Sequence, residues 1–82
     1  MFDLSDFLNS DVQTIAGRNE YLGVAANVKA GQHKEMEITG NAYNIRFHDG
    51  IATIECLWGD EPDQMDINLD FFIKTLTNWN PN

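Results

Sequence analysis

One cysteine and two histidines come nearest to a nucleophile paired with a general base in this sequence. They are Cys56, His33 and His48. A catalytic thiol needs a lowered pKa and a base within hydrogen-bond reach. Cys56 shares a predicted strand face with Ala52 and Ile54, which is the face expected to be buried, and both histidines fall in predicted turns. The sequence therefore predicts no enzymatic site.

The same residues do not form a metal or cofactor site. The two histidines lie 15 positions apart with a single cysteine, whereas zinc needs three or four ligands that usually occur in close pairs. A calcium loop needs ligands at alternating positions, and Pro62 and Met65 interrupt that spacing in the acidic segment. No glycine-rich phosphate-binding loop is present. We expect no metal and no cofactor.

The densest charged feature is a run of carboxylates between residues 60 and 70 with no cation among them. Such a run forms either a solvated loop and helix start or a docking surface for a basic partner. Acidic and aromatic side chains predicted on the sheet and on the last helix could extend that surface. The hypothetical partner-binding residues are Asp60, Glu61, Asp63, Asp66, Asp70, Phe71, Glu35, Glu37 and Tyr43.

The chain as a whole is acidic. It has 82 residues, and 13 Asp and Glu against 5 Lys and Arg give a net charge of −8. Nucleic acids and anionic membranes bind through cationic side chains, so we expect neither as a direct partner. A basic protein is favoured instead, although the same charge also serves solubility. The single cysteine, the lack of a signal peptide and the lack of a long apolar run favour the cytoplasm.

Hydrophobic periodicity predicts the elements that position these residues. An i, i+3, i+4 rhythm indicates a helix over about 3–16, and alternation indicates strands over about 21–30, 35–39, 42–48 and 51–58. The alanines of 21–30 are also compatible with a helix. Gly40-Asn41 forms either a turn, which we favour, or a bulge, and Asp49-Gly50 is typical of a two-residue hairpin turn.

A polar, acidic loop is expected over 59–66, and apolar spacing indicates a last helix over about 68–79, capped by Asp66 or Asn68. The predicted fold is a single α+β domain of order α-β-β-β-β-α. It is a small antiparallel four-stranded meander with the N-terminal and C-terminal helices packed on one face and the other face partly open to solvent. Tyr21 and Tyr43 are expected on the outer sheet face or its edge, and Trp58 and Trp79 in the core.

These observations predict a small, acidic protein-binding module. It would act as an inhibitor, immunity or antitoxin-type protein that occludes a basic, nucleic-acid-processing partner. The alternative is an accessory subunit or a homodimeric structural protein without catalytic activity, formed through the open sheet face or an edge strand.

Overall fold

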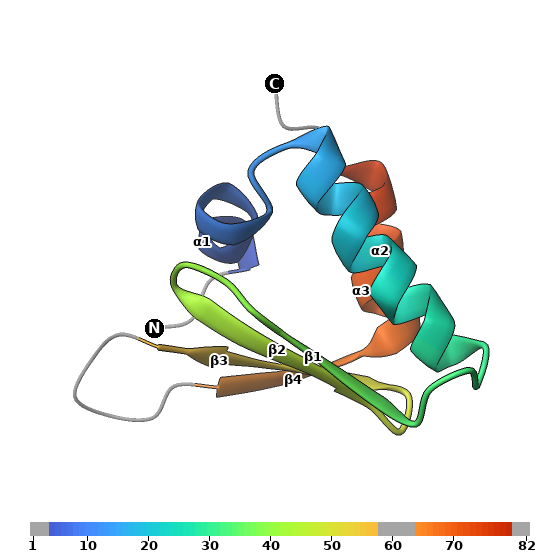
Figure 1. Ribbon diagram of the computed structural model, residues 1–82. Helices are drawn as coiled ribbons and strands as arrows, with labels where there is room; N and C mark the ends of the chain where they lie inside the picture. Colours follow the sequence, from blue (N-terminus) through green and yellow to red (C-terminus); the bar gives the residue numbers. More distant parts are fainter. Residues whose placement is uncertain (1–3, 58–63, 80–82) are drawn as a thin grey trace.

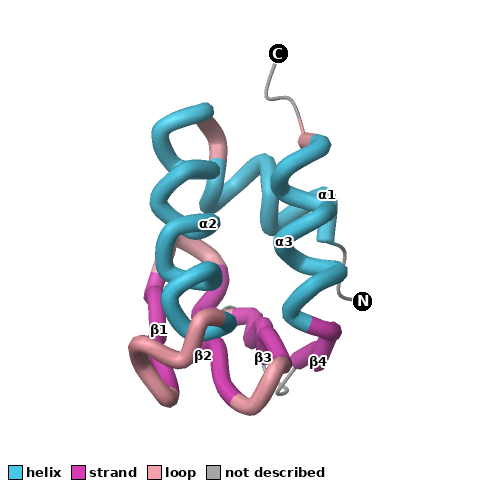
Figure 2. Tube along the Cα trace, turned by 90° about the vertical axis from the view of Figure 1, so that its right-hand side faces the viewer, coloured by secondary structure: helices cyan, strands magenta, loops and turns pink. Residues whose placement is uncertain are grey.

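The computed structural model describes residues 4–57 and 64–79, which form a helical layer on one face of an antiparallel sheet (Figures 1 and 2). The sheet has four strands in the order β1-β2-β3-β4. The predicted α+β class and the antiparallel meander are confirmed. The elements are α1 (Leu4–Phe7), the π-helix η1 (Leu8–Val12), α2 (Ile15–Lys29), β1 (Glu35–Thr39), β2 (Tyr43–His48), β3 (Ile51–Cys56), β4 (Gln64–Asn68) and α3 (Leu69–Asn78).

The first helical region ends earlier than the predicted helix over 3–16. After η1, Gln13 has a φ of 63°, which breaks the helical path. Thr14 then starts a second helix, since its Oγ1 accepts a hydrogen bond from the Gly17 N–H at 3.0 Å. Gly17, just past the predicted end of the first helix, therefore lies in the first turn of α2.

The strand predicted over 21–30 is wrong, because this segment belongs to the helix α2. Its buried residues Tyr21, Ala25 and Val28 are spaced i, i+4 and i+7, which places them on one helix face. The alternating apolar residues that suggested a strand include Ala26, which is exposed on the opposite side. The helix cap at Thr14 and the helix-favouring alanines outweigh the short period-two pattern.

The predicted hairpins of the sheet are confirmed. Gly40-Asn41 lies in a turn and not in a bulge, because Thr39 pairs with Asn44 and the Gly40 N–H donates to the Tyr43 carbonyl at 2.9 Å. Asp49 and Gly50 connect β2 to β3 with φ values of 49° and 74°, the left-handed conformation that a tight two-residue hairpin turn requires.

The sequence pattern missed the last strand. β4 begins in the predicted acidic loop 59–66 and ends at the predicted start of the last helix, and it pairs with β3 so that Thr53 lies opposite Asp66. One predicted strand is thus a helix and one predicted loop contains a strand, which leaves the element order unchanged. α3 matches the predicted last helix, and Asn68 caps it by accepting from the Phe71 N–H at 3.1 Å.

The core lies between the sheet and the helices. The Phe72 ring of α3 packs against Phe47 at 5.3 Å and against Phe7 at 6.3 Å between centroids. Tyr21 and Tyr43 meet the Phe7 ring edge-on at 5.5 and 5.8 Å, and they are only 4% and 5% exposed. The prediction that both tyrosines lie on the outer face or edge of the sheet is wrong, because their rings complete the aromatic core.

Candidate protein-binding face

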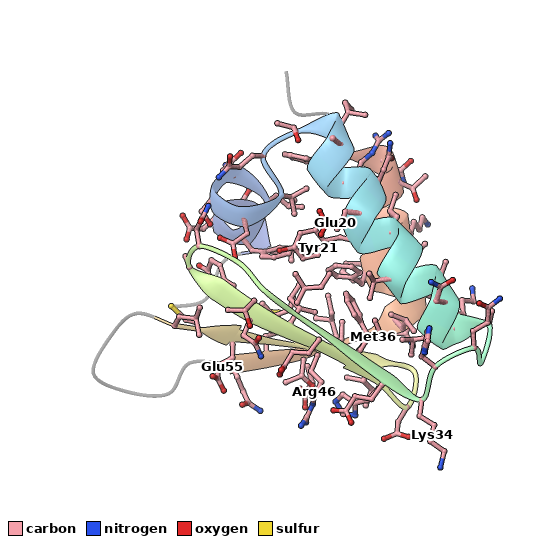
Figure 3. The ribbon with its side chains drawn as sticks, in the orientation of Figure 1. Glu20, Tyr21, Lys34, Met36, Arg46 and Glu55 are labelled. Carbon is pink, nitrogen blue, oxygen red and sulfur yellow. The ribbon has the colours of Figure 1, made fainter. Side chains whose placement is uncertain are left out.

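The sheet face away from the helices is covered by polar side chains. Successive residues of a strand point to opposite faces, and the strand register aligns those on this face into rows across the sheet. Figure 3 shows Arg46 and Glu55 on this side, whereas Tyr21 points between the layers. We call this surface the outer face, and it consists of Glu35, Glu37, Thr39, Asn44, Arg46, His48, Ile51, Thr53, Glu55, Gln64, Asp66 and Asn68.

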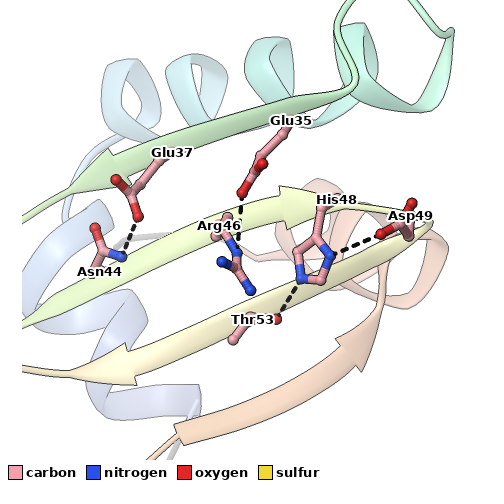
Figure 4. A network of polar contacts seen from close by, with 7 residues as sticks. All are labelled: Glu35, Glu37, Asn44, Arg46, His48, Asp49 and Thr53. Atoms are coloured by element: carbon pink, nitrogen blue, oxygen red, sulfur yellow. Dashed lines mark hydrogen bonds and ion pairs between the residues drawn. The ribbon is translucent and has the colours of Figure 1, made fainter.

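Hydrogen bonds and one ion pair fix the β1–β2 part of the outer face (Figure 4). Arg46 Nε lies 3.2 Å from Glu35 Oε1, and Asn44 Nδ2 donates to Glu37 Oε2 at 2.9 Å. The Thr39 hydroxyl donates to Asn44 Oδ1 at 2.7 Å. The ion pair is about half exposed, so it contributes little to stability. These contacts instead hold the two glutamates in defined positions.

His48 is held at the end of the same face by two partners. Its Nε2 lies 2.9 Å from Thr53 Oγ1, and its Nδ1 lies 3.3 Å from Asp49 Oδ2 (Figure 4). A neutral ring with the proton on Nδ1 satisfies both contacts, because Nδ1–H donates to the carboxylate and Nε2 accepts from the hydroxyl. Both ring nitrogens are therefore engaged within the protein, which leaves the imidazole a structural role at this corner.

A shallow hollow of about 260 Å³ lies in the outer face and is lined by polar side chains from all four strands. Drug-sized ligands usually occupy apolar pockets of at least about 300 Å³, so this hollow does not suit one. Among the charged residues of the face carboxylates outnumber cations, since Glu35, Glu37, Glu55 and Asp66 share it with the guanidinium of Arg46. No described cation forms an ion pair with Glu55 or Asp66. The outer face is therefore suited to cationic side chains of a partner.

A larger hollow of about 430 Å³ lies beside the start of α3 and includes Lys29, Lys34 and Asp70. Two of its charged side chains already form an ion pair, because Lys29 Nζ lies 2.6 Å from Asp70 Oδ1. The helix N–H groups are also used: Leu69 N–H donates to the Gly50 carbonyl at 2.9 Å, and Asn68 caps the helix. This hollow therefore offers no clear anion-binding chemistry.

The structure divides the predicted partner-binding residues among several places. Glu35, Glu37 and Asp66 share the outer face, on the two edge strands of the sheet. Asp70 lies instead on α3, where it pairs with Lys29, and the neighbouring Phe71 is 55% exposed. Asp60, Glu61 and Asp63 lie outside the described residues.

Tyr43 does not lie on the outer face, because its buried hydroxyl donates to Asp6 Oδ2 at 2.6 Å on the helix side of the sheet. Glu55 was missed by the sequence analysis. The signal that could have found it is the alternation along 51–58, which places Glu55 on the same face as Thr53 and opposite the buried Ile54.

The cysteine and the nearest histidine in sequence do not form a site. Cys56 packs against the core on the helix side of the sheet, whereas His48 lies on the outer face. Within residues 4–57 and 64–79, no three histidine, cysteine, aspartate or glutamate side chains are grouped so that they could hold a metal ion. None of the helices in this part of the chain is both long enough and apolar enough to cross a membrane.

Comparison of the chain with protein-family models, with curated proteins and with solved structures gave no match.

Proposed function

We propose that this protein is a non-enzymatic binding module that uses its outer face to dock a basic protein. The observation that carries the proposal is the set of four carboxylates that share the outer face with Arg46, three of them without a described ion-pair partner. A partner rich in lysine and arginine would place its positive side chains beside these carboxylates, so that the charges of the two surfaces are complementary. By its size and acidity the protein suits an inhibitor, immunity or antitoxin-type role in the cytoplasm, in which it occludes a nucleic-acid-processing protein.

The mechanism is occlusion by charge and shape. Negative potential speeds the encounter with a basic partner, and this effect weakens as salt screens it. The side chains of the outer face rise from hydrogen-bonded strands, and Glu35 and Glu37 are already oriented by Arg46 and Asn44. Less side-chain entropy is therefore lost when they bind. Asp60, Glu61 and Asp63 stay in the proposal as contributors on their charge alone.

A matched pair of aspartate variants tests this function. Asp66 lies on the outer face and Asp70 pairs with Lys29 on α3, so Asp66→Asn and Asp70→Asn change the net charge equally at different places. We expect tagged protein to capture a basic protein from lysate at low salt. Asp66→Asn should weaken this complex about fivefold, which corresponds to about 1 kcal/mol, and Asp70→Asn should leave it nearly unchanged.

Two results would count against the proposal. Equal losses with Asp66→Asn and Asp70→Asn would show that only overall charge matters and that the outer face has no special part. Recovery of the protein itself, without any basic protein and at either salt concentration, would favour the alternative of an accessory or homodimeric protein. Circular dichroism of each variant checks that the fold is retained.

A further inference from the structure

The strand β1 is an edge of the sheet with backbone groups directed outward. In an antiparallel pair, residues alternate between those that exchange hydrogen bonds with the neighbour and those whose N–H and C=O point away. The Gly40 N–H donates to the Tyr43 carbonyl, and this bond sets the alternation along β1. The backbone N–H and C=O groups of Ile38 and Met36 therefore point towards β2, and those of the residues on either side of them point away from the sheet. No hydrogen bond from another described segment of the backbone reaches these outward groups. They belong to Glu35, Glu37 and Thr39.

The two sides of this edge differ in chemistry. On the outer face, the exposed carboxylates of Glu35 and Glu37 flank the edge. On the helix side, Met36 and Ile38 are half-buried and pack against the core together with Val24 of α2. Figure 3 shows Met36 pointing into the space between the sheet and α2. A strand added here would therefore meet acidic side chains on one face and apolar side chains on the other.

A second copy of the chain is a poor occupant of this edge. β4, the other edge strand, repeats the pattern of β1, with Gln64-Met65-Asp66-Ile67-Asn68 against Glu35-Met36-Glu37-Ile38-Thr39. Pairing β1 with another β1 or with β4 brings carboxylates close together on the outer face. Like charges opposite one another destabilise strand pairs. The β1 edge is thus complementary to a basic strand and repels the acidic edge strands of a second copy.

We infer that β1 accepts an extended segment of the basic partner as a fifth strand. In such strand addition the backbone bonds provide affinity and the alternating side chains provide specificity. Lysine or arginine at every second position would lie beside Glu35 and Glu37, and the intervening apolar residues would contact Met36 and Ile38. This inference rests on the proposed function, because it specifies how the basic protein docks.

A defined peptide tests the inference directly. The probe is an end-capped octapeptide of alternating lysine and valine, and the control peptide has glutamate in place of lysine. We expect the lysine peptide to slow amide hydrogen exchange at Glu35, Glu37 and Thr39 by about tenfold or more, because these N–H groups gain acceptors only in an added strand. The glutamate peptide should leave their exchange unchanged. Binding of the lysine peptide without this protection overturns the inference.

Proline at the outward-facing position 39 is the sharpest variant. Thr39→Pro removes an N–H that faces away from β2, so the pairing of β1 with β2 is kept, as edge strands tolerate. Thr39→Val is its control, since both variants lose the hydroxyl contact with Asn44. Gln64→Pro makes the same change on β4. We expect Thr39→Pro to weaken peptide binding about tenfold, and the other two by less than about twofold.

The outcomes separate this inference from the proposed function. If Thr39→Pro, shown to be folded by thermal unfolding, binds the lysine peptide as well as Thr39→Val does, strand addition at β1 is wrong. If the captured basic protein is lost with Asp66→Asn but kept with Thr39→Pro, the binding function stands and only the β1 docking mode is wrong. If no basic protein is captured by the unaltered chain, the proposed function fails together with the docking mode that rests on it.

Discussion

At the scale of single residues, Asp11 joins the N-terminal helical segment to the β1–β2 turn. Its Oδ1 accepts from the Ala42 N–H and its Oδ2 from the Tyr43 N–H, both at 2.9 Å. Hydrogen bonds to a charged group contribute about 1.5–3 kcal/mol each, although two at one site do not add fully. We expect Asp11→Ala to lower the free energy of unfolding by about 2–3 kcal/mol, measured by urea denaturation.

The control for this prediction is Asp66→Asn, an exposed site where the free energy of unfolding should change by less than about 0.5 kcal/mol. A similarly small effect of Asp11→Ala would contradict the prediction.

The position of the Asp11 carboxylate also explains why residue 40 is a glycine. A Cβ atom at this position would overlap the Asp11 carboxylate and lie 3.1 Å from the Tyr21 hydroxyl, so only glycine allows the close approach.

Two buried tyrosines make stability depend on alkaline pH. Burial, with the nearby charges of Asp11 and Glu20, raises the pKa of Tyr21 to about 12, and burial with the hydrogen bond to Asp6 also raises the pKa of Tyr43. The folded state therefore holds both phenol protons more tightly than the unfolded state, whose tyrosines titrate near pH 10. Their stabilising effect is complete below pH 10 and falls as the pH rises further; the contribution of Tyr21 is lost as the pH approaches 12, and that of Tyr43 is still falling there.

We therefore expect the urea midpoint to be constant across pH 8–9 and to fall between pH 10 and 12. Each tyrosine should contribute about 1 kcal/mol per pH unit. In Tyr21→Phe the free energy of unfolding should decline less steeply over this window, because one of the two titrating groups is removed. An equal slope in Tyr21→Phe and in the unaltered protein would contradict the assignment to Tyr21.

At the scale of elements, we expect two glycines of α2 to respond oppositely to the same substitution. A Cβ atom at Gly17 would overlap the Val12 carbonyl oxygen at the end of η1, whereas nothing lies within 4 Å of one at Gly23. Gly17→Ala should lower the free energy of unfolding by about 1–3 kcal/mol, because backbone must shift. Gly23→Ala should raise it by about 0.4–1 kcal/mol through helix propensity. Thermal unfolding of both variants checks the opposite signs, and a shift in the same direction would contradict the geometry.

The same elements show where local pattern was sufficient and where it was not. The Asp49-Gly50 turn was predictable because its conformation suits few other residue types, and α3 was predictable from its apolar spacing. Residues 21–30 fit a strand period and a helix period alike, and the strand was favoured because the pattern of 21–30 alone does not include the helix cap at Thr14. β4 was missed because a polar edge strand of five residues gives a weak signal.

The candidate site was harder to predict than the fold. The sequence pointed to a contiguous acidic stretch, whereas the outer face brings together residues from four strands through their register. Glu35 and Glu37 were found by their charge and alternation. Tyr43 was misplaced although it alternates with Ile45 and Phe47 on one face of its strand, and that face is buried.

At the scale of the whole molecule, no other described segment pairs with the outward backbone groups of the two edge strands β1 and β4, and charge decides whether a second copy pairs there. Glu37 and Asp66 occupy equivalent central positions of β1 and β4. Their repulsion should keep the protein monomeric, as charged residues on edge strands commonly do. We expect Glu37→Gln combined with Asp66→Asn to self-associate at neutral pH as concentration rises, measured by sedimentation velocity.

The matched control is Glu20→Gln combined with Asp70→Asn, which removes the same two charges from the helices α2 and α3. This control should sediment as a monomer, because a net charge two units less negative is not by itself enough to drive association when the carboxylates at the strand edges are kept. A dimeric unaltered protein, or association of both double variants to the same extent, would show that the edge carboxylates do not govern pairing. Association of the edge variant alone would assign to Glu37 and Asp66 the exclusion of a second copy from the sheet edges.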